Sequence, residues 1–315
     1  MTLSAAWPVR RALTAELGMA LPAFVDHHVH LHLIDAADLP SRGIAAVVDL
    51  GGDPMTLARR GSGLPRVSFA GAFLTAPGGY PSGRSWAPAA VVRTITDACR
   101  HPGVQGGART AVDEQADAGA SVIKIALHAD AGPVVSDEEL AAIVASARER
   151  GLPTVAHAQG RGQVDRAIAA GVDALAHTPF DEPVTRRQIS RAVAGGQAWI
   201  STLDIHKGAD RTRAISNLRA FAARGGRVLY GTDLGNGSLP VGLNRRELLA
   251  LHEAEVRGDA LIDALTDPWP AVRSDDAVST FIAGPAPTDP TDPDDVATWL
   301  SRGTVVPTEE LTRVD

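Results

Sequence analysis

Lysine is nearly absent from this chain of 315 residues, which contains two lysines and 28 arginines. One of the two, Lys124, lies within the apolar segment Val122–Leu127. Arginine stays charged in proteins, whereas the amine of a buried lysine can be neutral. One chemistry open to a neutral amine is the capture of carbon dioxide as a carbamate, a carboxylate that can bridge two metal ions.

Other scarcities narrow the class of protein. A single cysteine, Cys99, excludes an internal disulfide and fits a reducing cytoplasm. Residues 1–21 include Arg10, Arg11 and Glu16, and neither a signal-peptide core nor a stretch near 20 apolar residues is present. The net charge is -7, and no stripe of basic residues is present. We therefore expect a soluble cytoplasmic protein with neither nucleic acid nor membrane as a partner.

From Ala23 onward, short apolar segments alternate with amphipathic helical segments, a pattern typical of a parallel sheet with crossover helices. Several strands are continuous apolar runs, as expected for strands buried on both faces. Ser136 and Glu139 form a capping-box pattern that opens a helix reaching Arg150. The eight predicted strands are Phe24–Asp26, Ile44–Asp49, Val67–Phe73, Val122–Leu127, Thr154–His157, Ala174–His177, Ala198–Thr202 and Val228–Gly231.

Eight such units predict an α/β fold of the (β/α)8 TIM-barrel type. An open doubly wound sheet is the alternative, but no Gly-rich phosphate loop follows the first strand. We assign residues 1–22 to an N-terminal extension, 23–266 to the barrel and 267–315 to a C-terminal extension rich in proline and aspartate, which packs on the barrel or trails from it. One short helix is expected within that extension, at 294–302.

Residues able to bind a metal gather at the predicted strand ends, where barrel enzymes place their chemistry. A single histidine that ends an apolar strand is more often a core residue than a ligand, but here five strands each offer such a group. His28 and His30 are two residues apart and therefore face the same side of one strand. Imidazole and carboxylate ligands suit zinc, and also manganese, iron or nickel. The predicted metal ligands are His28, His30, Lys124, His157, His177 and Asp233.

These segments resemble the amidohydrolase superfamily of metal-dependent hydrolases, over about residues 24–236. The likeness is greatest to the branch of imidazolonepropionase-like and Xaa-Pro dipeptidase-like amidohydrolases. The segments that carry the resemblance are Phe24–His30, Gly119–Ile125, Gly151–Ala158, Ala170–His177 and Tyr230–Asp233.

The resemblance implies a binuclear centre, most simply of two zinc ions. His28, His30 and Asp233 would bind one ion, and His157 and His177 the other, with carboxylated Lys124 and a hydroxide bridging the two. Asp233 would also act as the acid/base. The expected activity is hydrolysis of a linear or cyclic C–N amide bond in a small molecule. Lactone or ester hydrolysis is an alternative, aromatic deamination a weaker one, and a catalytically inactive metal-binding barrel the non-enzyme reading.

Two departures from the family bear on the pocket and the termini. Relatives often have Gly-Gly-His after the third strand, whereas this chain has Gly78-Gly79-Tyr80, and the flanking β-sandwich of relatives is predicted to be absent or vestigial. The expected partner is a small-molecule substrate, with a homo-oligomer possible. Tyr80, Arg161, His206 and Lys207 are candidate substrate-binding residues, and no organic cofactor is expected. His27 and His32 are excluded as ligands, while His101, His128 and His252 are assigned to loops or helix surfaces.

Overall fold

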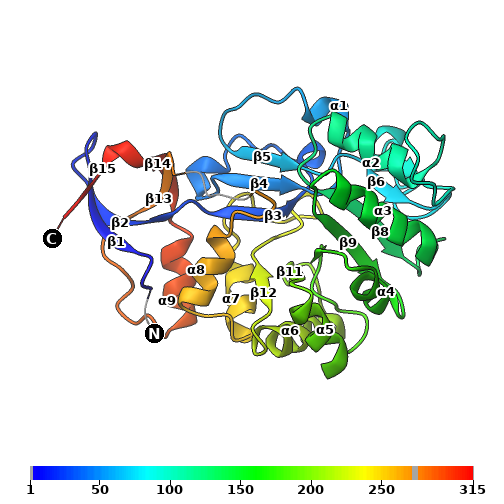
Figure 1. The fold of residues 1–315 in the computed structure, drawn as a ribbon. Helices are drawn as coiled ribbons and strands as arrows, with labels where there is room; N and C mark the ends of the chain where they lie inside the picture. Colours follow the sequence, from blue (N-terminus) through cyan, green and yellow to red (C-terminus); the bar gives the residue numbers. More distant parts are fainter. Residues whose placement is uncertain (1–2, 272–275, 315) are drawn as a thin grey trace.

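The computed structural model describes residues 3–271 and 276–314. The fold is α/β: two parallel sheets alternate with helices along the chain, and an antiparallel sheet lies at one end (Figure 1). Residues 1, 2, 272–275 and 315, which belong to the predicted terminal extensions, lie outside the described residues. Within the described ranges, no helix has the length and apolar character needed to cross a membrane.

All eight predicted strand segments are strands, in two parallel sheets. The smaller sheet has the order β3-β4-β5 and the larger the order β12-β11-β10-β9-β8-β6-β7. The third predicted segment is split, because β5 pairs with β4 whereas β6 pairs with β8. The strands are β3 (Val25–Val29), β4 (Ala46–Asp49), β5 (Arg66–Phe69), β6 (Phe73–Thr75), β7 (Val92–Thr94), β8 (Ile123–His128), β9 (Thr154–Gln159), β10 (Ala174–Leu175), β11 (Ala198–Ile200) and β12 (Arg227–Leu229).

Backbone hydrogen bonds join the last strand of the larger sheet to the first strand of the smaller one. The segment that follows β12 runs parallel to β3 and forms a bridge between Val29 and Leu234. The amide of His27 donates to the carbonyl of Tyr230 at 3.0 Å, and the amide of His30 to that of Leu234 at 2.8 Å. The chain therefore brings the ends of β3 and β12 side by side.

Two of the helices between the strands begin at capping boxes that the sequence contains. Ser136 caps α3 with the predicted capping box, and Thr185 caps α5 in the same way through Gln188. The helix predicted over 294–302 is present as α9, against α7. The helices are α1 (Pro54–Leu57), α2 (Ala108–Asp117), α3 (Asp137–Glu149), α4 (Gln163–Ala170), α5 (Arg186–Ala194), α6 (Gly208–Ala222), α7 (Arg245–Glu253), α8 (Asp259–Thr266) and α9 (Pro293–Leu300).

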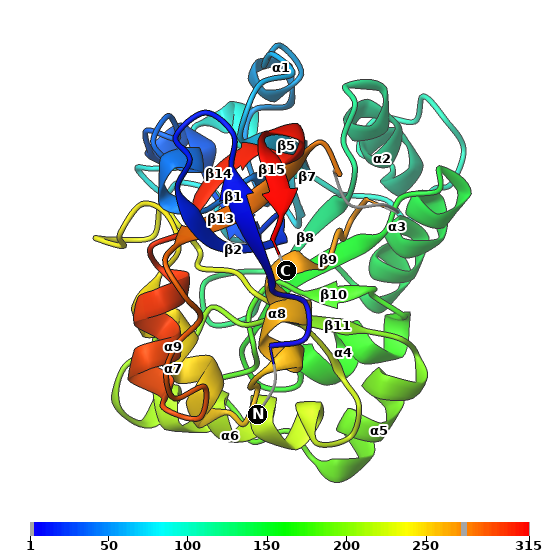
Figure 2. The same ribbon diagram turned by 90° about the vertical axis from the view of Figure 1, so that its left-hand side faces the viewer.

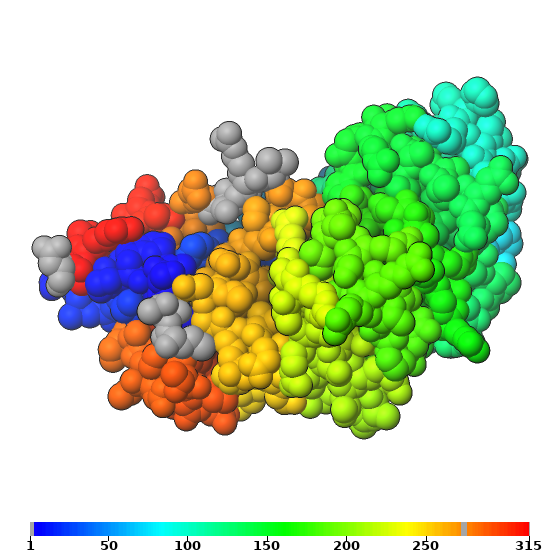
Figure 3. Space-filling model, turned by 60° about the horizontal axis from the view of Figure 1, so that its bottom comes forward, coloured from blue at the N-terminus to red at the C-terminus, as the bar shows by residue number. Residues whose placement is uncertain are grey.

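The terminal segments form a five-stranded antiparallel sheet of order β14-β13-β2-β1-β15 (Figure 2). The expectation of one short helix and no strands in the C-terminal extension is therefore wrong, and flanking β-structure is present as a single sheet. β2 pairs with β13 from Ser279↔Pro22 to Ala283↔Gly18, so each strand depends on a partner about 260 positions away. Figure 3 shows the N- and C-terminal segments side by side at one end of the molecule. The strands are β1 (Trp7–Arg11), β2 (Leu17–Pro22), β13 (Val278–Ala283), β14 (Thr304–Pro307) and β15 (Leu311–Arg313).

Candidate metal centre

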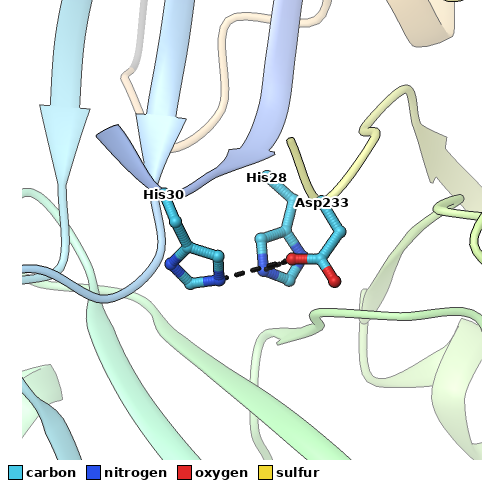
Figure 4. Close-up of side chains that lie close together, drawn as sticks. All are labelled: His28, His30 and Asp233. Carbon is cyan, nitrogen blue, oxygen red and sulfur yellow. Dashed lines mark ion pairs between the residues drawn. The ribbon is translucent and has the colours of Figure 1, made fainter. Parts of the chain in front are cut away.

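Three predicted ligands meet where an edge strand of the smaller parallel sheet, β3, lies beside an edge strand of the larger one, β12. His28 and His30 come from β3 and its exit, and Asp233 follows β12 (Figure 4). Nε2 of His28 lies 3.2 Å from Oδ1 of Asp233, and Nε2 of His30 lies 3.3 Å from the same oxygen. The ligand atoms of all three residues lie within 4.8 Å of one another, and all three side chains are buried.

The hydrogen bonds behind the two histidines determine which nitrogen faces the site. Nδ1 of His28 donates to the carbonyl of Ala176 at 2.8 Å, and Nδ1 of His30 to that of Gly51 at 3.2 Å. A carbonyl oxygen only accepts, so each ring carries a proton on Nδ1, and in a neutral His28 ring Nε2 presents a lone pair. Burial lowers the pKa of His28 well below 6.5, which keeps this ring neutral.

The lone pair of His28 Nε2 therefore faces a carboxylate oxygen with no proton between them, and Nε2 of His30 lies 3.3 Å from the same oxygen. Nε2 of His28 is buried and makes no hydrogen bond within the described part of the chain. Groups that only accept cannot satisfy one another, whereas a divalent cation accepts an electron pair from each of them. These residues thus fit a bound metal ion, and the carbonyls behind the rings are the orienting contacts typical of metal-bound histidine.

The backbone around Asp233 is held in an unusual conformation. Its φ is +58°, a left-handed value that is uncommon outside glycine. The side-chain amide of Asn236 donates to Oδ2 at 2.8 Å, which leaves Oδ1 to face the histidines. Buried Asp26 accepts from the hydroxyl of Thr232 at 2.6 Å and from the backbone amide of His28 at 3.1 Å, so it ties both ligand-bearing segments together.

Gly51 allows the close packing behind His30. Its φ is +151°, and a Cβ there would lie 2.0 Å from Cε2 of Phe73. The missing side chain lets the Phe73 ring stack on His30, with ring centroids 5.8 Å apart. A larger residue would displace the ring, the histidine or the carbonyl that His30 contacts.

Lys124, His157 and His177 line the same cavity from β8, β9 and the segment after β10. The ring of His177 lies between those of His28 and His157, with centroids 4.7 Å and 4.8 Å away. Burial lowers the pKa of His157 to about 3 and that of His177 well below 6.5. Burial also lowers the pKa of Lys124 to about 7, against the opposing charges of Asp233 and Asp49. All six predicted ligands therefore face one cavity, and the rings of His28, His157 and His177 are neutral.

The cavity has a volume of about 490 Å³ and is lined by two of the four candidate substrate-binding residues. Tyr80 and His206 line it, and the Tyr80 ring stacks on His157 at 5.1 Å between centroids. Arg161 and Lys207 are exposed and lie outside its lining. Burial raises the pKa of Tyr80 to about 12, so its hydroxyl is a hydrogen-bond donor at neutral pH.

His128 lines the cavity as well, so its assignment to a loop or helix surface is wrong. β8 extends to His128, and residues four apart on a strand face the same side, so His128 shares the face of Lys124. Its ring lies 5.0 Å from Tyr80 and 5.2 Å from His157. The same two-residue period places Gln159 beside His157. By contrast, both ring nitrogens of His27 contact backbone carbonyls of Tyr230 and Asp267, outside the cavity lining.

No protein-family model matches the sequence, and no curated protein matches it. Solved structures do match. A Xaa-Pro dipeptidase with bound methionine aligns with a TM-score of 0.68 at 17% identity, over 94% of this chain and 87% of that chain. An ochratoxinase of A. niger gives 0.69 at 18% identity, over 92% and 82%. A putative prolidase from Bifidobacterium longum gives 0.65 at 22% identity, over 93% and 80%. The chain therefore has the fold of these structures.

Proposed function

We propose that this protein is a metal-dependent hydrolase that cleaves a C–N amide bond of a small molecule. The observation that carries the proposal is the convergence of His28, His30 and Asp233 on one point, with ligand atoms within 4.8 Å and no proton between His28 and Asp233. A metal ion at the base of a cavity of about 490 Å³ is suited to hydrolysis of a small substrate. The likeness to a Xaa-Pro dipeptidase and an ochratoxinase supports this class of enzyme.

The two parallel sheets are proposed to be parts of one (β/α)8 barrel. β5 and β6 would be two halves of one strand, which pairs with β4 on one side and β8 on the other. The bridge between Val29 and Leu234 would close the ring between β3 and β12. In such a barrel the ligands would all lie at the carboxyl ends of the strands, which is where barrel enzymes bind their substrates.

The centre is proposed to hold two zinc ions. His28, His30 and Asp233 would hold one, and His157 and His177 the other. Lys124 would bridge them as a carbamate, formed when its neutral amine adds to carbon dioxide and releases a proton. The support for this step is the burial of Lys124, 1% exposed, with a pKa of about 7 that leaves much of the amine neutral.

Bound divalent ions would lower the pKa of a water molecule from 15.7 to about 7 and polarise the substrate carbonyl. Asp233 would accept a proton from the attacking water and pass it to the leaving nitrogen as the C–N bond breaks. Asn236 holds Oδ2 of Asp233 and so fixes the orientation of the carboxylate. The Tyr80 hydroxyl would donate a hydrogen bond to the carbonyl oxygen as negative charge develops there.

The test is the metal content of protein purified without chelators and with bicarbonate, measured by elemental analysis together with hydrolysis of amide and lactone panels. About two divalent ions per chain are expected, by analogy with two-metal hydrolases, falling in Lys124→Ala. One ion that is indifferent to Lys124 would contradict the bridged centre. Protein that takes up no metal after reconstitution would refute the hydrolase proposal, and cleavage of lactones but not amides would redirect it to ester chemistry.

A further inference from the structure

The cavity wall around the predicted ligands is largely aromatic. Tyr80, Trp86 and Phe73 form one group, with ring centroids 5.9 Å apart for Tyr80 and Trp86 and 6.1 Å for Phe73 and Trp86. Phe180 lines the cavity beside His206. Binding of an aromatic or bulky apolar group against flat apolar walls of this kind is favourable, because the group is removed from water. A volume of about 490 Å³ also suits a molecule larger than a single amino acid.

Charged groups are confined to the metal centre. Among the described residues that line the cavity, the lysine, arginine and carboxylate side chains are Lys124 and Asp233. Arg84 lies outside the lining, with its guanidinium 5.9 Å from the centroid of the Tyr80 ring and its side chain exposed. A free carboxylate held against Phe180 and His206, away from the metal centre, would therefore lose its hydration without gaining an opposite charge, which is strongly unfavourable.

His206 offers an uncharged polar contact at the aromatic wall. Its ring lies 4.0 Å from that of Phe180, and its Nε2 is buried without a hydrogen-bond partner among residues 3–271 and 276–314. Burial lowers the pKa of His206 to about 4, so the ring is neutral at pH 7. Buried polar atoms are nearly always hydrogen-bonded in folded proteins, so an unpaired one in a cavity wall indicates a partner on the ligand.

Given the hydrolase proposed above, we infer that the substrate is an uncharged amide whose aromatic or bulky apolar part packs against Tyr80, Trp86 and Phe180, and that His206 forms a hydrogen bond to an uncharged polar group on it. His206 is then a specificity-determining residue. It discriminates against substrates that carry a free carboxylate at that position, because a neutral ring supplies no compensating charge.

A matched pair of ligands tests this inference: 4-benzamidobenzamide, which is neutral, and 4-benzamidobenzoate, which differs by its carboxylate. Dissociation constants are measured by calorimetry on metal-free and zinc-loaded protein at pH 7.5, and hydrolysis is followed separately. The neutral ligand should bind about tenfold more tightly or better, since an unpaired buried charge is costly. His206→Ala should weaken its binding about fivefold, the effect of one lost hydrogen bond, with metal content unchanged. His206→Gln should restore part of the loss, and Lys207→Ala, next in sequence but exposed, should change nothing.

Tighter binding of the carboxylate would overturn the inference, most directly if Arg84→Ala removed the preference. Binding of neither ligand, or a His206→Ala variant with wild-type affinity for the carboxamide, would overturn it too. If zinc-loaded protein still prefers the neutral ligand but hydrolyses neither compound, the hydrolase proposal is refuted and the inferred ligand class is kept. The two failures are therefore distinguishable.

Discussion

Replacing Asp233 by asparagine should change the stability of the fold in opposite directions with and without metal. The substituted residue would keep the left-handed backbone, since asparagine adopts φ near +58° readily. Its side-chain carbonyl would take the place of Oδ2 and accept from Asn236, and its amide nitrogen would face the Nε2 atoms that lie 3.2 and 3.3 Å from Oδ1 in the wild type. The variant therefore gains a donor beside the Nε2 lone pair of His28, and it loses a buried charge.

The size of each effect follows from these contacts. In metal-free protein, a new buried hydrogen bond should stabilise Asp233→Asn by about 1 kcal/mol. With free metal at roughly one hundred times the wild-type dissociation constant, binding stabilises the wild type by about 2.7 kcal/mol. A variant that binds the metal roughly a hundredfold more weakly gains only about 0.4 kcal/mol under the same conditions. The wild type should then be the more stable protein by about 1 kcal/mol, the reverse of the order without metal.

Urea denaturation at pH 8 with EDTA and with zinc measures both differences, from the free energies of unfolding of each protein. Asp204→Asn is the matched control, because Asp204 is ion-paired to Arg246 at 2.9 Å and lies outside the cavity lining. It should lose a few tenths of a kcal/mol under both conditions. An Asp233→Asn protein that is less stable than the wild type in EDTA, or that gains as much from zinc, would refute the argument from converging lone pairs.

Three further predictions concern the scaffold. Burial raises the pKa of Glu247 from 4.5 to about 7, so the folded state loses about 3 kcal/mol of stability as the pH rises from below 4.5 through 7. Glu247→Gln should flatten that part of the pH profile of the free energy of unfolding, measured by urea titration. An unchanged slope would assign the loss to another group. Ser136→Ala removes the cap of α3 and should cost about 1 kcal/mol in thermal or urea unfolding, whereas Ser136→Asp should not. Trp199 stacks on Phe221 at 4.0 Å with both rings buried, and Trp199→Ala should cost about 3–5 kcal/mol in the same assay, with a loss below ~1 kcal/mol counting against the packing.

Most of the parallel strands could be predicted from the sequence because they are short apolar runs, whereas β7, a three-residue strand that is only half-buried, could not. α3 could be predicted because Ser136 and Glu139, three residues apart, form a capping box at its N-terminus. α2 has no such signal, because its N-cap is Gly107, which makes no side-chain hydrogen bond. The terminal sheet was missed because β2 and β13 owe their pairing to one another across most of the chain, and neither alone has a distinctive pattern.

The ligands could be predicted because strand period and strand ends place His28, His30 and Asp233 without knowledge of the loops. Loop conformation decided the rest. Tyr80 and Arg161 are both loop residues after strands, yet one lines the cavity and the other is exposed. The period of two would have revealed His128 beside Lys124, had the strand been extended by one residue. That Nε2 of His206 is unpaired depends on tertiary packing, so it could not be predicted from the local sequence.

The terminal sheet also bears on how the chain folds during synthesis. β1 and β2 are synthesised before β13 and can pair as a hairpin, but β2 then presents an open edge until β13 is made. An open edge of this kind is a template for pairing with other chains. Translation proceeds at about 5–20 residues per second, so the edge stays unpaired for about 13 to 50 seconds while the parallel strands form. We expect slow translation or stalled chains to aggregate through β2, and chaperones that cover exposed strand edges to protect them.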